Sequence, residues 1–91
     1  MYRLIFTRRF QRSLPKFQRA HPELRRRIVQ VLASLKANPF DPRLRLHQLH
    51  GDMEGTYAIR ITYGYRITLI LRITEHEIDL LDIGSHDDVY R

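Results

Sequence analysis

The segment Thr56–Ile73, TYAIRITYGYRITLILRI, constrains the fold of this chain more than any other. Residue types alternate along it, and β-branched and aromatic side chains dominate, which is typical of two strands joined by a tight turn. The alternation gives this β-hairpin one mostly apolar face, made by Tyr57, Ile59, Ile61, Tyr63, Tyr65, Ile67, Leu69, Leu71 and Ile73. Such a face has to be covered, so the rest of the chain is expected to pack against it.

The turn of the hairpin is expected to hold three residues, Thr62–Gly64. A two-residue turn would set arginines beside apolar residues, because a register slip of one residue moves every side chain to the other face. The three-residue turn sets Arg60 directly opposite Arg66 and places Gly64 in the left-handed conformation of a bulged turn. Like charges opposed on a sheet destabilise it by up to about 1 kcal/mol, so the two arginines either extend into water or bind an anion.

The segments before the hairpin predict one strand and two helices. Tyr2–Thr7 alternates as a short strand, and an apolar stripe with helical spacing follows over residues 10–17. Pro15 lies inside this stripe and is expected to kink the helix or to restart it. A second helix is expected over residues 22–37, because Pro22 suits a first helical position and Asn38-Pro39 stops the helix.

A last strand follows the hairpin and completes the element order β-α-α-β-β-β. Its two faces are expected to carry Ile78, Leu80 and Asp82 on one side and Asp79, Leu81 and Ile83 on the other. Gly84 ends the strand, and a short polar tail follows. The prediction is an α+β fold in one domain, residues 1–91, with both helices on one face of a small antiparallel sheet and the other face partly open.

Composition limits the classes of function. The chain has 16 Lys and Arg residues against 10 acidic residues and a formal net charge of +6, which favours phosphate or an acidic protein as partner. It has no cysteine, which excludes disulfides and thiolate chemistry and fits a reducing compartment. The N-terminal sequence has neither a signal peptide nor a membrane span, so a cytoplasmic protein without membrane contact is expected.

The open face of the sheet is the candidate site. It is expected to carry Arg60, Thr62, Arg66, Thr68 and Arg72, with His47, His50, His86 and Tyr90 at its rim. Cleavage of RNA through its own 2′-hydroxyl needs a base, an acid and a cation for the charge on phosphorus. Histidine titrates near neutral pH and suits the proton steps, whereas the arginine fork suits the phosphate. This chemistry needs no metal and no cofactor.

Each candidate has a structural alternative. The pair His47 and His50 has metal-ligand spacing but lacks a third ligand at a fitting distance, so no metal site is predicted. His86 could cap the strand end, and Tyr90 could pack on the sheet. Glu54 is expected to be a turn residue. The remaining histidines, His21 and His76, are expected to be solvated.

The chain resembles the RelE/ParE superfamily of type II toxins, small bacterial proteins that a co-expressed antitoxin neutralises. The resemblance rests on the opening YRLIFTRRFQRSL, the connector LHQLHGDMEGTYAIRI, the hairpin GYRITLIL and the ending LDIGSHDDVYR. It covers nearly the whole chain and implies the same β-α-α-β-β-β order. It also implies one of two activities: RelE-like members cut mRNA in the ribosomal A site, whereas ParE-like members inhibit DNA gyrase and lack the catalytic residues.

The histidine content favours the nuclease branch, and the resemblance then assigns roles. It implies His86 as general acid and His50, or His47, as the base that a YafQ-like branch holds in this loop. Arg60 and Arg66 would stabilise the phosphorane, and Tyr90 would stack on a base. His47, Thr62 and Arg72 would contact RNA.

The chain departs from the family pattern at two places. A lysine pair that some members hold before the hairpin is missing, and Gly84-Ser85-His86 stands where many members read G-H-R. The implied partners are the cognate antitoxin, the ribosome and mRNA, with DNA contacted only through the antitoxin complex. A gyrase inhibitor and an inactive toxin that survives as a repressor subunit are the alternatives.

Overall fold

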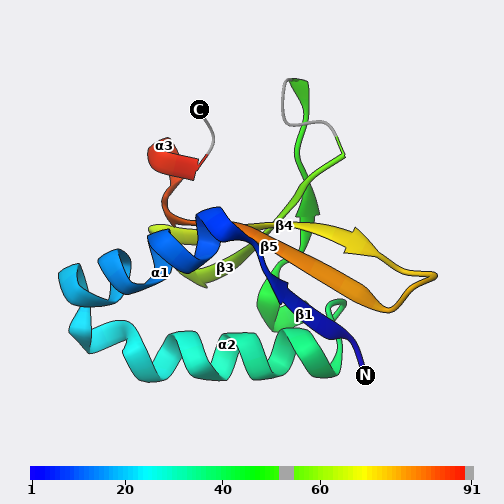
Figure 1. Ribbon diagram of the computed structural model, residues 1–91, viewed down its shortest axis with the longest axis horizontal. Coiled ribbons are helices and arrows are strands. Elements are labelled where there is room, and N and C mark those ends of the chain that lie inside the picture. Colours follow the sequence, from blue (N-terminus) through cyan, green and yellow to red (C-terminus); the bar gives the residue numbers. More distant parts are fainter. Residues whose placement is uncertain (52–54, 90–91) are drawn as a thin grey trace.

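The computed structural model describes residues 1–51 and 55–89 and contains a five-stranded sheet with three helices (Figure 1). The strands are β1 Arg3–Phe6, β2 His47–Gln48, β3 Tyr57–Thr62, β4 Tyr65–Arg72 and β5 Glu77–Ser85. The helices are α1 Arg8–Ala20, α2 Arg25–Ala37 and the short α3 His86–Val89, with 3₁₀ turns at Pro22–Leu24 and Pro42–Leu44. Among the described residues, no helix is both long enough and apolar enough to cross a membrane.

The strand order is β1-β5-β4-β3-β2, which confirms the predicted fold class with one difference. Strands β2 to β5 pair antiparallel, but β1 pairs parallel with β5, so the sheet is mixed. Tight turns force antiparallel pairing only between strands that they join directly. The two helices and three strands between β1 and β5 leave the direction of β1 free, and the sequence pattern therefore did not set it.

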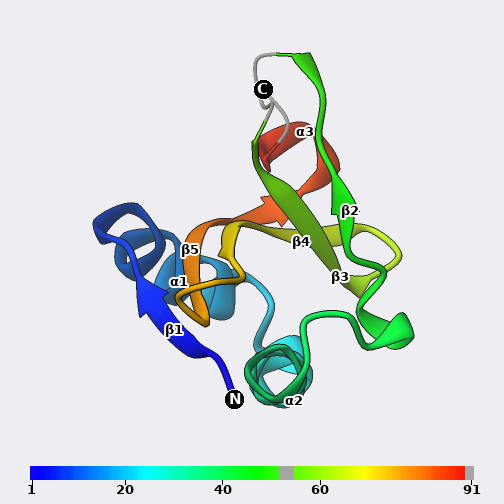
Figure 2. The same ribbon diagram turned by 90° about the vertical axis from the view of Figure 1, so that its right-hand side faces the viewer.

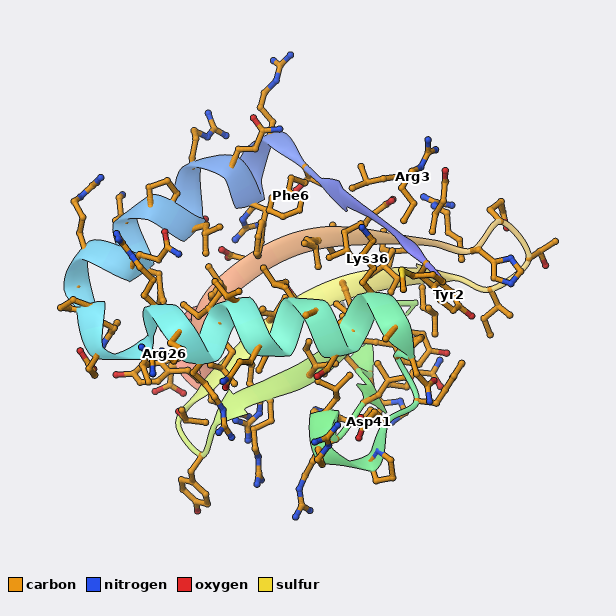
Figure 3. The ribbon with its side chains drawn as sticks, turned by 90° about the horizontal axis from the view of Figure 1, so that it is seen from below. Tyr2, Arg3, Phe6, Arg26, Lys36 and Asp41 are labelled. Carbon is orange, nitrogen blue, oxygen red and sulfur yellow. The ribbon has the colours of Figure 1, made fainter. Side chains whose placement is uncertain are left out.

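The core lies between the helices and the sheet. It is built from Phe10, Phe17, Ile28, Val31, Leu35, Leu44, Ile59, Ile61, Ile67, Leu69, Ile78, Leu80 and Ile83. Helix α1 contributes its predicted stripe and continues through Pro15 as one helix, so the predicted restart at this residue is wrong. Helix α2 ends at Ala37, as predicted. Figure 3 shows α2 lying across the sheet.

The hairpin has the predicted pairing but a different turn. Arg60 lies opposite Arg66, as expected. The prediction for Gly64 is wrong, because its φ is not positive. Thr62 pairs with Tyr65, which leaves a two-residue turn, and a shift in register between Arg60 and Thr62 restores the pairing of the apolar residues. A bulge of this kind adds one residue to one strand and so changes the register without a longer turn.

A second irregularity changes the face pattern of β5. The pairing with β4 shifts between Thr68 and Leu69, and Ile78, Leu80 and Ile83 all join the core. The predicted alternation, which put Ile83 opposite Ile78 and Leu80, is therefore wrong. A bulge re-aims the side chains that follow it.

The two faces of the sheet carry different elements. Figure 2 shows α2 below the sheet, whereas α3 and the described residues that follow β2 lie above it. The tail that was expected to be irregular begins with α3. These two segments flank the face that α2 leaves uncovered, and they carry His86 and His50 respectively.

Candidate functional site

The strand register brings His86 and Arg66 to the same end of the sheet. Ser85 pairs with Tyr65 and Gly84 pairs with Arg66, and His86 follows directly as the first residue of α3. The His86 side chain is 64% exposed, with its Nδ1 3.8 Å from a carboxylate oxygen of Asp87. This imidazole is therefore largely exposed at the end of the hairpin.

The Arg66 guanidinium is held by the backbone of its own turn. Its Nη1 donates to the carbonyl oxygens of Thr62, Tyr63 and Tyr65 at 2.9, 3.0 and 3.2 Å. These contacts involve only Nη1, which carries two of the five N–H donors of a guanidinium. Thr62 thus lies at the same end of the hairpin, half-buried, with its carbonyl bonded to Arg66. The result is a positive charge held at the turn end of the hairpin.

The Arg60 side chain lies beside Tyr63 and near α2. Its guanidinium carbon lies 5.8 Å from the ring centre of Tyr63, and the side chain lines a pocket of about 140 Å³ with Arg27 of α2 and Arg43. Its Nε is buried and has no hydrogen-bond partner among the described residues. Because Arg60 pairs with Arg66, the two residues lie on the same face of the hairpin, and a role for Arg60 at the site stays a prediction.

Arg72 lies at the far end of β4. Seven residues separate it from Tyr65, a distance of about 20 Å along an extended strand. Its Nη2 forms an ion pair with Asp79 at 2.9 Å, and this hydrogen bond raises the pKa of Arg72. The structure does not bring Arg72 to His86, and its contact with RNA stays a prediction.

The two histidines of the connector separate. His47 is exposed on β2 opposite Ala58, with its Nδ1 2.9 Å from the carbonyl oxygen of Arg45. It lines a pocket of about 500 Å³ beside the turn Pro42–Leu44. His50 is exposed and lies two residues after the end of β2. The choice between His47 and His50 as the base stays a prediction.

The remaining candidates are placed as follows. Tyr90 and Glu54 lie outside the described residues. Thr68 is buried in β4 with 1% of its surface exposed, so it is not a surface contact. Within residues 1–51 and 55–89, no group of three or more His, Asp or Glu residues could hold a metal ion.

Sequence reasoning missed a cluster of rings around His21. The His21 side chain is only 25% exposed, so the expectation that it is solvated is wrong. Its ring centre lies 4.5 Å from that of Phe17 and 4.6 Å from that of Tyr65. The spacing of Phe17 and His21, four residues apart at the end of a helix, is a local signal that could have indicated this contact.

This cluster borders a pocket with a volume of about 630 Å³. One wall is the polar face of α1, with Arg9, Arg12 and Lys16. The other wall is formed by Tyr65 and the end of β5, so the pocket reaches the residue that precedes His86. The pocket and the His86 end of the hairpin are therefore neighbours.

Comparison with solved structures places the fold among bacterial toxins. YafQ from E. coli strain BL21(DE3) has a TM-score of 0.82 at 12% identity, with 100% of both chains covered. The E. coli DinJ-YafQ complex has a TM-score of 0.72 at 12% identity, also with 100% of both chains covered. The YoeB-YefM complex from Staphylococcus aureus has a TM-score of 0.72 at 17% identity, covering 94% of this chain and 98% of that chain.

The family comparison covers nearly the whole sequence. No curated protein sequence matches this chain significantly. A family model described as the bacterial toxin of type II toxin-antitoxin system, YafQ, matches residues 2–91. The match includes the hairpin β3–β4, the segment between β2 and β3 that contains His50, and helix α3, which begins at His86. The chain therefore belongs to the YafQ family of toxins from bacterial type II toxin-antitoxin systems.

Proposed function

We propose that this toxin is an endoribonuclease that cuts mRNA on the ribosome. His86 is the general acid, His50 is the general base, and Arg66 binds the phosphate at the cleaved bond. Arg66 takes precedence over Arg60 in this role, because Arg60 lines a pocket beside α2. Tyr90 remains the proposed stacking residue. A cognate antitoxin is the proposed protein partner, since relatives of the same fold are solved as complexes with DinJ and YefM.

The observation that carries the proposal is the register between β4 and β5. It sets Arg66 opposite Gly84, two residues before His86, which supports a site at this end of the sheet with an exposed imidazole and a held guanidinium. The three carbonyls that hold Nη1 keep the guanidinium in place before substrate arrives. A charge that needs no reorganisation during the reaction is worth about 3–4 kcal/mol of barrier in comparable sites.

The proposed reaction is an in-line transfer within the RNA. His50 takes the proton of the 2′-hydroxyl, and the 2′ oxygen forms a bond to phosphorus. The bond from phosphorus to the 5′ oxygen breaks, and His86 gives its proton to that oxygen. The products are a 2′,3′-cyclic phosphate and a 5′-hydroxyl. Arg66 would bind the non-bridging oxygens, whose charge grows in the transition state, through a bidentate fork.

The test is inducible expression with mapping of mRNA 5′ ends, run on wild type and on His86→Ala. We expect growth arrest and new 5′ ends inside translated codons for wild type only, because loss of a proton donor lowers the rate by roughly 10²–10⁴-fold. His76→Asn is the matched control. His76 is exposed in a distant turn with a φ of 56°, a conformation that Asn tolerates.

Two outcomes contradict the proposal. If the variant His86→Ala is fully toxic, His86 is not the general acid. Arrest without new 5′ ends, unchanged in the double variant His50→Ala/His86→Ala, indicates a target other than mRNA, such as gyrase.

A further inference from the structure

We propose that the pocket between α1 and the ends of β4 and β5 binds a nucleotide of single-stranded RNA that flanks the cleaved bond. The proposal rests on the nuclease function above and adds a second site of interaction with the same substrate. The pocket has a volume of about 630 Å³, and Ser85 forms part of its wall. His86 is the next residue, and consecutive Cα atoms lie about 3.8 Å apart. A nucleotide in this pocket would therefore be next to the nucleotide whose 5′ oxygen receives the proton from His86.

The α1 wall supplies the charge for a phosphate. Arg9, Arg12 and Lys16 are spaced three and four residues apart, which places them on one face of the helix. Arg9 is paired with Asp82 at 2.8 Å, and Asp82 is the only acidic residue among the described residues that line the pocket. Arg12 and Lys16 therefore carry two positive charges that no acidic residue of the pocket wall balances. Phosphate is the ligand for which such a pair is best suited.

At the other end of the pocket, aromatic rings are available for stacking with a nucleobase. The ring centres of His21 and Tyr65 lie 4.6 Å apart, and both residues are half-buried at the pocket wall. Phe17 packs against both, at 4.5 Å from His21 and 5.2 Å from Tyr65, so the rings are held in place from behind. Stacking of one base on such rings raises affinity by roughly 5- to 150-fold.

The combination favours RNA over an acidic peptide. A peptide rich in Asp and Glu would use the cations of α1 but has no part that matches the rings. A nucleotide uses both, because it joins a phosphate to a flat base within one unit. Single-stranded RNA is commonly recognised in this manner, by stacking together with backbone contacts.

The test is an NMR titration with a short RNA that is 2′-O-methylated throughout and so cannot be cut. We expect the backbone amide signals of Gly84, Ser85 and Ala20 to shift on binding. The variant Arg12→Gln/Lys16→Gln is expected to bind at least about tenfold more weakly than wild type. Its slope of log affinity against log salt is expected to be shallower by roughly 0.7 for each phosphate that the variant no longer neutralises.

The control variant is Arg25→Gln/Arg26→Gln, which removes the same charge from exposed positions on α2 (Figure 3). It is expected to bind within about twofold of wild type, since these residues do not line the pocket. A third variant, His21→Ala, probes stacking and is expected to weaken binding with an unchanged salt slope. Arg12 and Lys16 are exposed, so the first variant tests the proposal even if His21→Ala fails to fold.

Three results overturn the inference. The first is equal binding by the two charge variants, which would mean general attraction by the basic surface. The second is an absence of shifts at the pocket amides of wild type. The third is tighter binding of a Glu-rich peptide at these amides, which would assign the pocket to a protein partner. None of these depends on the growth assay with His86→Ala, so failure of this inference and failure of the nuclease proposal are distinguishable.

Discussion

At the residue scale, Thr7 joins the first helix to the last strand through one hydroxyl. Its Oγ1 accepts from the backbone N–H of Phe10 at 3.3 Å and donates to the carbonyl oxygen of Leu80 at 2.5 Å. Loss of an N-cap costs about 0.5–2 kcal/mol, and loss of the hydroxyl hydrogen bond to the Leu80 carbonyl, which still accepts from the Thr7 backbone N–H at 3.4 Å, costs about 0.5–1.5 kcal/mol. We therefore expect Thr7→Ala to lower the free energy of unfolding by about 1–3 kcal/mol.

Thermal unfolding followed by circular dichroism would measure this loss, at about 4–8 °C in Tm for each kcal/mol. Thr7→Ser retains the hydroxyl and should lose less than half as much. Equal Tm values for the Ala and Ser variants would show that the hydroxyl contributes nothing.

Single residues also show where sequence reasoning reaches its limit. The opposition of Arg60 and Arg66 was predictable, because it follows from the apolar pattern of one hairpin. The position of the Arg60 side chain was not, because it depends on a bulge and on α2, which lies far away in sequence. His21 is a similar case, since its contact with Tyr65 joins a helix end to a strand 44 residues later (65 − 21 = 44). Side-chain positions set by packing between distant segments leave no local signal.

At the scale of elements, α1 contains a proline in its interior, where proline is unfavourable. Pro15 lies in the helix interior, is exposed, and cannot donate to the carbonyl of Gln11. A proline at such a position costs roughly 3 kcal/mol, partly offset by about 0.4–1 kcal/mol from the stiffer unfolded chain. We expect Pro15→Ala to raise the free energy of unfolding by about 1–2 kcal/mol, measured by urea denaturation with the m-value unchanged.

Pro42 provides the matched control. It begins a 3₁₀ turn, where its fixed φ and missing N–H are well tolerated, and it is exposed as well. Pro42→Ala should therefore lower stability by about 0.4–1 kcal/mol. If Pro15→Ala also lowers stability, the proline is stabilising α1 through a contact that the helix geometry does not explain.

Elements were predicted well where the pattern is local. The hairpin, the end of α2 and the position of β5 follow from alternation, helical spacing and breaker residues within short windows. The parallel pairing of β1 with β5 and the two bulges depend on how distant strands fit together. The same holds near the proposed site. The placement of Arg66 opposite Gly84 depends on the β4–β5 register, whereas the ring cluster depends on docking of α1.

At the scale of the whole molecule, some of the arginines in the described part of the chain are paired with acidic residues and others are not, so the net positive charge is unevenly distributed. Four acidic residues are paired with arginines: Glu77 with Arg3, Asp82 with Arg9, Asp41 with Arg43, and Asp79 with Arg72. The Arg43 guanidinium lowers the pKa of Asp41 to about 2, chiefly through a side-chain hydrogen bond, so this acid stays charged at neutral pH. The basic residues of α1 and of the start of α2 then carry much of the net charge of +6.

This charge predicts that binding of the proposed antitoxin depends on the salt concentration. Long-range attraction raises the association rate and is screened by salt, whereas short-range contacts set the dissociation rate. We expect the association rate constant to fall at least about tenfold between about 0.01 M and about 0.15 M salt, as the Debye length shortens from roughly 30 Å to roughly 8 Å. The dissociation rate should change much less, and stopped-flow fluorescence with a labelled antitoxin would measure both rates.

The variant Arg25→Gln/Arg26→Gln makes this prediction specific to charge. It lowers the formal net charge from +6 to +4 (+6 − 2 = +4) without touching a buried residue. Its association rate should be slower than that of wild type at low salt and should converge with it at high salt, because screening removes the difference. An association rate that does not respond to salt in either protein would mean that the antitoxin is recognised by shape and apolar contact, with no role for the basic surface.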